Sequence, residues 1–246
     1  MKVVVLGGTQ GMGRAIAQRL AARGDDVFIL GIGESDLERS AQDLKARHPQ
    51  GKSLGWGVLD LEKPETFASA LDAADKALGD FDTVIVTAAL FGTQDALEAD
   101  IEFTRRLVTV NYANTLVFCE HARKRILARG GGRLVVFSSV AGDRGRKPVA
   151  IYGSTKAGLT HYLESLDHKF HAEGLHVLTV KPGFVKTGMT AGLKPPPFAG
   201  EPDQVAADVV KAIDAGKPVL YTPGMWALVM LVIRWLPRFV MRKIGF

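Results

Sequence analysis

The sequence of 246 residues predicts an α/β fold, a single doubly wound domain around a mainly parallel sheet of about seven strands. Three observations support this prediction. Short apolar runs alternate with stretches of helical periodicity along the chain. The first apolar run leads into a glycine-rich turn and then a helical pattern. Polar or glycine-containing loops follow the predicted strand ends, and because parallel strands end at one edge of a sheet, these loops would form one site.

The first predicted unit is a strand, a glycine turn and a helix. Val3–Leu6 is apolar, and Gly7, Gly11 and Gly13 follow before the helical pattern begins. Such glycines let backbone N–H groups approach a pyrophosphate at the helix N-terminus. The spacing is G-x-x-x-G-x-G rather than the usual G-x-G-x-x-G, and a tight turn alone would also need glycine. The position at the first strand–helix turn favours phosphate binding.

The later elements continue the alternation, with right-handed crossovers expected between parallel strands. Pro64 suits the start of a helix that runs toward Leu78. Strands are expected at 27–30, at a segment that ends near 58–61, and at 83–86, 134–137, 176–180 and 219–221. Further helical patterns are expected at 34–47, around 107–126 and from 152 through 166. Since no linker or repeat interrupts this order, residues 1–222 would form one Rossmann domain and residues 223–246 a helical tail.

Ser139, Tyr152 and Lys156 form the candidate catalytic group. Ser139 lies just past the predicted strand at 134–137, and Tyr152 and Lys156, at i and i+4, share one helical face. A phenol with a pKa of about 10 is a poor acid or base at neutral pH, and an ammonium one turn away would lower that pKa. Ser139 could hold a carbonyl or alcohol oxygen while Tyr152 passes the proton. The alternative is a half-buried tyrosine beside a solvated lysine.

Taken in this order, the motifs resemble the short-chain dehydrogenase/reductase family over almost the whole chain. Beyond the glycine turn, Asp60 matches the family's acidic residue near the adenine, and Pro182-Gly183 with Thr187 matches its Pro-Gly-x-x-x-Thr segment. The catalytic residues that this resemblance implies are Asn111, Ser139, Tyr152 and Lys156.

The resemblance also implies a role for each of these residues. Tyr152 would be the general acid in reduction, and Lys156 would lower its pKa and hold the nicotinamide ribose hydroxyls. Ser139 would orient the substrate oxygen, and Asn111 would keep a helix kinked around a proton-relay water. The chain departs from the family at 87–90, where Thr-Ala-Ala-Leu replaces the usual Asn-Asn-Ala-Gly, which leaves the hydrogen bonds of that loop open.

The implied cofactor is NADP(H) or NAD(H). An acidic residue after the second strand would accept the adenosine ribose hydroxyls, and an arginine there would pair with a 2′-phosphate, but Gly31-Ile32-Gly33 offers neither. Arg14 could reach a phosphate, so the choice stays open with a slight preference for NADP(H). The implied cofactor-binding residues are Gly7, Thr9, Gln10, Gly11, Met12, Gly13, Asp60, Leu61, Ala88, Ala89, Tyr152, Lys156, Pro182, Gly183, Val185 and Thr187.

Two loops are expected at the substrate end of the site. A proline-rich loop at 190–201 would cover the substrate with apolar contacts from Leu193 and Phe198, unless it is an ordinary surface connection. Arg144, Arg146 and Lys147, between the candidate serine and tyrosine, could receive a substrate phosphate. The alternative is that these three cations are simply solvated.

The C-terminal segment combines apolar and basic residues. Its uninterrupted apolar part is about a dozen residues, short of the ~20 that span a bilayer. Arg234, Arg238 and Arg242 recur at every fourth position, which predicts a basic stripe along one amphipathic helix. Such a helix would make peripheral contact with an anionic membrane surface, or it would pack on the domain or on a dimer partner.

Composition limits the partners. The formal net charge is +5, no acidic residue follows Asp214, and no basic run interleaved with aromatics occurs before the tail, so we expect no nucleic-acid partner. The N-terminus enters a strand at once, which favours the cytoplasm, with the inner face of the cell membrane as the site of any tail contact. The single cysteine, Cys119, predicts helix packing and no metal site. The family resemblance implies a homodimer or homotetramer.

The sequence therefore predicts an NAD(P)H-dependent oxidoreductase that acts on a ketone or secondary alcohol. Segments 153–159 and 190–194, with the tail, look closest to the reductases of decaprenylphosphoryl-ribose 2-epimerases, which implies a polyprenyl-phosphate-linked keto sugar or other lipid-like ketone as substrate. One alternative is a ketoreductase or alcohol dehydrogenase for a soluble steroid, acyl or small ketone. Another is a nucleotide-binding sensor without turnover, against which the complete catalytic set argues.

Overall fold

The computed structural model describes residues 1–48 and 55–245, and its strands form one sheet. All neighbouring strands are parallel, in the order β3-β2-β1-β4-β5-β6-β7. The strand order reverses between β1 and β4, which places the loops after these two strands at the switch point where open α/β sheets bind ligands. The strands are β1 Lys2–Leu6, β2 Asp26–Gly31, β3 Gly55–Val58, β4 Thr83–Val86, β5 Gly132–Phe137, β6 Leu175–Pro182 and β7 Val219–Thr222.

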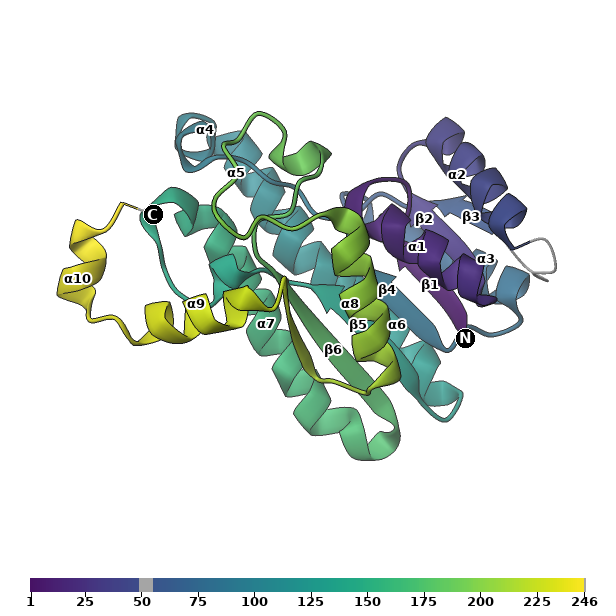
Figure 1. Cartoon of the computed structure of the whole chain (residues 1–246). Coiled ribbons are helices and arrows are strands. Elements are labelled where there is room, and N and C mark those ends of the chain that lie inside the picture. The colour runs from purple at the N-terminus through teal and green to yellow at the C-terminus, as the bar shows by residue number, and fades with distance from the viewer. Residues whose placement is uncertain (49–54, 246) are drawn as a thin grey trace.

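Helices cover both faces of the sheet, as Figure 1 shows, so the predicted doubly wound fold is confirmed. One face carries α1 Gly11–Arg23, α2 Glu34–Arg47 and α8 Pro202–Asp214. The other face carries α3 Phe67–Leu78, α6 Thr115–Ala128 and α7 Ala150–Phe170, with α4 Gln94–Ala99 and α5 Ile101–Val108 before α6.

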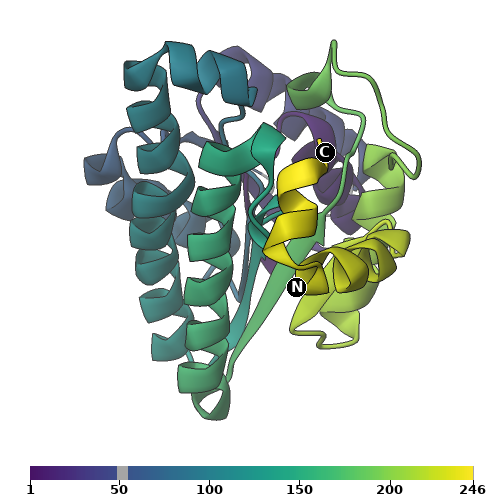
Figure 2. The ribbon, with the colours of Figure 1, turned by 90° about the vertical axis from the view of Figure 1, so that its left-hand side faces the viewer.

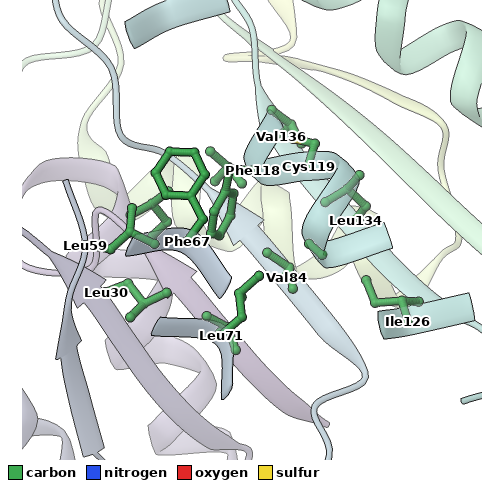
Figure 3. Close-up of a cluster of buried hydrophobic side chains, with 14 of the residues drawn as sticks. Leu30, Leu59, Phe67, Leu71, Val84, Phe118, Cys119, Ile126, Leu134 and Val136 are labelled. Atoms are coloured by element: carbon green, nitrogen blue, oxygen red, sulfur yellow. The ribbon is translucent and has the colours of Figure 1, made fainter. Parts of the chain in front are cut away.

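The core under α3 and α6 is close-packed and aromatic (Figure 3). Phe67 and Phe118 meet edge to face with ring centroids 5.7 Å apart, above Leu71 and Val84. Cys119 is buried in the same cluster, and burial raises the pKa of its thiol. A protonated, enclosed thiol is unreactive, which agrees with the packing role expected from the sequence.

The helical region around 107–126 is not uniform. Asp100 accepts a hydrogen bond from the Phe103 N–H at 2.9 Å and so begins α5, and a π-helical stretch at Thr109–Asn114 joins α5 to α6. Asn111 lies in that stretch, where its amide bonds both the N–H and the carbonyl of Leu90 at 2.7 Å. The helix therefore departs from α geometry at Asn111, and the departure ties it to the loop after β4.

The tail differs from the predicted single helix. It forms α9 Met225–Trp235 and α10 Arg238–Lys243, separated at Leu236 and Pro237. Leu236 is extended, with φ −63° and ψ 131°, because a residue before proline is pushed out of the α region. Arg234 thus belongs to one helix and the later arginines to another, so the expected basic stripe along one helix axis is wrong. None of the helices in the described part of the chain combines the length and the apolar content that a membrane span requires.

The tail lies against the start of α7, on the side of the molecule that Figure 2 turns toward the viewer. The guanidinium of Arg144 donates to the Leu236 carbonyl at 2.9 Å, and the Lys147 ammonium donates to the Arg242 carbonyl at 2.7 Å. On its inner side, Met230 and Ile233 of α9 are buried with Val140. The tail is therefore attached to the loop that carries the candidate serine.

Candidate active site

Two cavities lie side by side at the carboxyl edge of the sheet. The tyrosine cavity, about 730 Å³, is lined by Ser139, Tyr152 and Lys156. The glycine cavity, about 320 Å³, is lined by the turn after β1 and by Asp60. Both cavities share the side chains of Met12, Thr87, Ala89, Thr187 and Met189. They are therefore two parts of one cleft.

The end of β5 and the start of α7 position the catalytic candidates. Ser138 faces α7, where its Oγ donates to the Lys156 carbonyl at 2.9 Å and lies 2.7 Å from the Thr160 hydroxyl. The next residue, Ser139, faces the tyrosine cavity, and its Oγ accepts from the Ala141 N–H at 3.1 Å. This alternation in the extended chain selects Ser139 as the serine of the site.

Two glycines allow α7 to lie this close to the serine loop. A Cβ at Gly142 would lie 2.6 Å from the Lys156 carbonyl carbon, and a Cβ at Gly153 would lie 2.8 Å from the Ala141 carbonyl oxygen. Main-chain atoms form both contacts, so a larger residue could not be accommodated by a side-chain movement. The approach of loop and helix brings the predicted serine, tyrosine and lysine to one cavity.

The electrostatics of the pair differ from the sequence prediction. Burial raises the pKa of Tyr152 to about 12, and the hydroxyl of Ser139, rather than Lys156, is the group that lowers it. The Lys156 ammonium donates to the Phe137 carbonyl at 2.9 Å and lies 5.8 Å from the Tyr152 ring centroid. Burial lowers the pKa of Lys156 to about 8. Tyr152 thus keeps its proton across the neutral range and is prepared as a proton donor.

Asn111 lines neither cavity and is 1% exposed. It reaches the site through Leu90, at the end of the loop whose sequence departs from the family pattern. In that loop the Thr87 hydroxyl donates to the Leu6 carbonyl at 3.0 Å and lies 3.3 Å from the Gly7 carbonyl. Thr87 therefore supplies the local hydrogen bonds that the sequence left open, and ties β4 to the glycine turn.

The glycine cavity fits a dinucleotide phosphate. Gly7 and Gly11 have φ of +90° and +51°, and a Cβ at Gly13 would lie 2.2 Å from the Gly7 carbonyl oxygen. The first turn of α1 carries no acidic residue, and Gln10 makes no side-chain cap. The predicted residues that line this cavity are Gly7, Thr9, Gln10, Gly11, Met12, Gly13, Asp60, Leu61, Ala88, Ala89 and Thr187. Pro182, Gly183 and Val185 line the tyrosine cavity instead.

Arg14, the cation expected near the adenosine end, and Arg106, which the structure adds, are both already paired with carboxylates. Arg14 lies 3.6 Å from Asp43 and does not line the glycine cavity. Arg106, which does line it, donates from Nε to Glu62 at 2.7 Å. Ile32 follows β2, at the position where a residue that selects the adenosine ribose was expected, and its apolar side chain is 75% exposed.

The tyrosine cavity has mostly apolar walls, several of them missed by sequence reasoning. The proline-rich loop at 190–201, called the lid from here on, contributes Leu193 and Phe198, as expected, and α9 contributes Trp226, Val229 and Ile233. The Trp226 Nε1 donates to the Phe198 carbonyl at 3.2 Å, which joins the tail to the lid. The repeat of apolar residues at 226, 229, 230 and 233 was the available signal for this inner face of α9.

Phe91 is a further residue at the site that sequence reasoning missed. The Phe91 ring meets the Tyr152 ring edge to face, with centroids 5.2 Å apart. Of the three cations in the serine–tyrosine loop, only Arg146 lines the tyrosine cavity. Arg144 and Lys147 instead bind tail carbonyls, as described above.

Comparisons with known proteins agree with this geometry. Residues 1–197 match the short chain dehydrogenase family model. The chain belongs to the short-chain dehydrogenase/reductase family. It is therefore an oxidoreductase of a family that binds NAD(P)H.

An uncharacterized oxidoreductase of Mycobacterium tuberculosis, similar over nearly its full length, is 33% identical over 98% of this chain and 96% of its own. A short-chain type dehydrogenase/reductase from Mycobacterium ulcerans superposes with a TM-score of 0.80 at 26% identity, covering 89% of this chain and 87% of its own. The fold is also shared with an actinorhodin polyketide ketoreductase solved with NADPH, at a TM-score of 0.79, 23% identity and coverage of 89% and 94%.

Proposed function

We propose that this short-chain dehydrogenase/reductase is an NAD(P)H-dependent ketoreductase, which interconverts a ketone and a secondary alcohol. The observation that carries the proposal is the convergence of Ser139, Tyr152 and Lys156 on one cavity that continues into the glycine cavity. A binding protein without turnover would not need a buried phenol, serine hydroxyl and ammonium at that junction.

When bound, the nicotinamide cofactor supplies the hydride. In the direction of reduction, Ser139 Oγ orients the substrate oxygen, and Tyr152 Oη donates its proton to that oxygen. The raised pKa of Tyr152 keeps this proton in place at neutral pH. Lys156, with a pKa of about 8, is mostly charged there and stabilises the phenolate that remains. Asn111 positions the loop after β4 through Leu90.

We propose the residues of the glycine turn, with Asp60 and Thr187, as the groups that hold the dinucleotide. Backbone N–H groups at the start of α1 would receive its pyrophosphate, and Lys156 its nicotinamide ribose. No carboxylate occupies 31–33 to select ribose hydroxyls, which supports NADP(H) over NAD(H). Arg14 contributes less to that preference than the sequence indicated, because Asp43 already pairs with it.

We further propose a lipid-linked ketone, such as a keto sugar on a polyprenyl phosphate, as the substrate. The tyrosine cavity is large, and apolar side chains from the lid and α9, including Leu193, Phe198 and Trp226, form much of its wall. Arg146 adds one cation to that wall. A soluble steroid or acyl ketone would also pack against the apolar wall, but it would provide no anion to pair with Arg146.

The outer face of α9 supports peripheral contact with an anionic membrane. Leu228, Leu231, Val232 and Trp235 follow the i, i+3, i+4, i+7 pattern and are each at least 58% exposed. A helix that is apolar on both faces needs cover on the outer one. The tail carries several basic residues and no acidic one, so a second tail would repel it whereas anionic lipid would attract it. The cell location that follows is the inner face of the membrane.

We retain from the family a homodimer or homotetramer. Val108 of α5 and Val117 of α6 are 38% and 41% exposed and offer apolar surface for such an interface. Sedimentation equilibrium tests this assembly, and a monomer at micromolar concentration would contradict it.

Tyr152→Phe tests the proposed reaction. We expect turnover of a ketone by NADPH to fall roughly 10²–10⁴-fold, because the general acid is lost, while NADPH binding is retained. Tyr112→Phe is the matched control, since Tyr112 packs on Gly158 and lines neither cavity. Absorbance at the nicotinamide band measures turnover and fluorescence titration measures binding. Equal turnover in the Tyr152→Phe and parent proteins would remove Tyr152 from the mechanism.

A further inference from the structure

A basic cavity of about 560 Å³ lies between the loop that precedes α7 and helix α10. Five cationic residues line it, and none of its described lining residues is acidic: Arg144, Arg146, Lys147, Arg238 and Arg242. The hydrogen bond from Lys147 to the Arg242 carbonyl holds the loop and α10 together. The start of α7 and the tail lie on the side of the molecule that faces the viewer in Figure 2.

None of these cations forms a salt bridge with a carboxylate among the described residues, although Asp143 acts on Arg146 electrostatically. Arg144 and Lys147 each donate to a backbone carbonyl of the tail, at 2.9 and 2.7 Å. Because both carbonyl acceptors are neutral, these hydrogen bonds attach the tail to the loop but leave the positive charges of Arg144 and Lys147 uncompensated. Because like charges gathered at one place repel, an anion between them is bound favourably.

Arg146 connects this basic cavity to the catalytic site, since it lines both the basic cavity and the tyrosine cavity. Its Nε is buried and makes no hydrogen bond to any described residue. The neighbouring Asp143 is occupied, because Lys181 donates to its Oδ1 at 2.7 Å and Tyr221 to its Oδ2 at 2.6 Å. Burial also lowers the pKa of the Arg146 guanidinium. A partly desolvated, unpaired guanidinium is costly unless a ligand supplies the acceptor.

We infer that the basic cavity is a phosphoryl-binding subsite, which holds the phosphate of the same molecule whose carbonyl lies at Tyr152. The inference rests on the proposed reaction and adds the second point at which the substrate is held. A phosphate suits five surrounding cations better than a carboxylate does, because it presents more acceptor oxygens and accepts bidentate arginine contacts. The position of Arg146 between the cavities makes it the residue that distinguishes phosphorylated from neutral ketones.

The test is a binding measurement on the full chain saturated with NADP⁺, so that the cofactor's own phosphate site is filled. Geranyl phosphate is the probe, geraniol is its neutral counterpart, and calorimetry gives both affinities. We expect Arg146→Gln and Arg242→Gln each to weaken geranyl phosphate binding about tenfold or more, with geraniol affinity unchanged. Lys243→Gln is the matched control, because it removes one charge from the same helix outside the cavity. We expect it to bind geranyl phosphate like the parent.

Equal geranyl phosphate affinity in the Arg146→Gln, Arg242→Gln and Lys243→Gln proteins would overturn the subsite. A loss confined to phosphatidylglycerol vesicles, with soluble geranyl phosphate bound normally, would also overturn it and assign the charge to lipid head groups. Arg242 is exposed, so its variant keeps the test valid if Arg146→Gln does not fold. Because binding is measured without turnover, a protein that binds geranyl phosphate but reduces no ketone would refute only the proposed reaction.

Discussion

The glycine cavity is formed by backbone packed against backbone, whereas side chains from the lid and the tail form much of the wall of the tyrosine cavity. At Gly13 an added Cβ would meet the Gly7 carbonyl oxygen at 2.2 Å, a main-chain atom that cannot turn aside. Across the cleft, Trp226 and Phe198 come from segments far apart in the chain and meet through one hydrogen bond. A single substitution in the glycine turn should therefore abolish binding in the glycine cavity, whereas substitutions in the wall of the tyrosine cavity should change its shape and affinity by smaller steps.

The two cavities also differ in how their cations are paired. Arg106, at the glycine cavity, is held by Glu62, while Arg146, at the tyrosine cavity, has no described partner. A paired arginine is satisfied within the fold, whereas an unpaired one in a cavity wall is available to a ligand. Under the proposed function, the glycine cavity would hold the cofactor by fixed geometry, and the tyrosine cavity would hold the substrate by shape and by a charge that the substrate pairs.

The largest expected effect is on the glycine side. Gly13→Ala should lower NADPH affinity by more than ~100-fold, because the turn must open to relieve the clash with Gly7 and with the Thr87 hydroxyl at 2.4 Å. Gly224→Ala is the control, since a Cβ there meets nothing within 4 Å. Fluorescence titration measures affinity and circular dichroism reports folding. Normal NADPH binding by a folded Gly13→Ala protein would show that the turn is not the phosphate cradle.

Trp226→Ala should act on the substrate side alone. It removes a cavity wall and the link to the lid, so we expect KM for an apolar ketone to rise roughly tenfold with NADPH affinity unchanged. Trp235, on the opposite face of α9 and 81% exposed, is the matched control. Trp235→Ala should keep KM and instead reduce flotation with phosphatidylglycerol vesicles. Unchanged flotation, or a raised KM in the Trp235 variant, would contradict the assignment of the two faces.

Lys156, at the junction of the cavities, predicts a pH dependence of stability. Its folded pKa of about 8 lies below the ordinary value of 10.5, so between these values the unfolded chain binds more protons than the folded one. The free energy of unfolding should therefore rise with pH from about 8 toward 10.5. Urea titrations at pH 7.5 and 9.5 measure this rise. We expect the rise to be smaller in Lys156→Met. An identical rise in both proteins would mean that burial does not lower the pKa of Lys156 in the folded protein.

The smallest expected effect is on stability, and it differs between the unpaired Arg146 and the paired Arg106. Arg146→Met should raise the free energy of unfolding by roughly 1 kcal/mol, or ~2–4 °C in Tm, because it removes an unpaired and partly buried charge. Arg106→Met should leave stability the same or slightly lower, since it breaks an exposed pair with Glu62. Differential scanning calorimetry without added phosphate measures both. A destabilised Arg146→Met protein would show that Arg146 has a structural partner.

Local pattern was sufficient for much of the site. The strand at 134–137 followed by Ser139, and the i, i+4 relation of Tyr152 and Lys156, required only the periods of strand and helix. The pKa order of that pair did not follow from spacing, because Lys156 turns to the Phe137 carbonyl and burial dominates both groups. The basic loop was recognised, but not that only Arg146 of its three cations would line the catalytic cavity.

The sequence by itself determined the alternation of strands and helices, the glycine turn and the order of the catalytic residues, because each depends on neighbours a few positions away. The tertiary structure alone decided the substrate side. Trp226 packs where a Gly183 Cβ would lie, and Arg146 is left without a hydrogen-bond partner among the residues that the structure describes. These outcomes depend on contacts between segments distant in the chain, whose partners are chosen by packing and charge rather than by local periodicity.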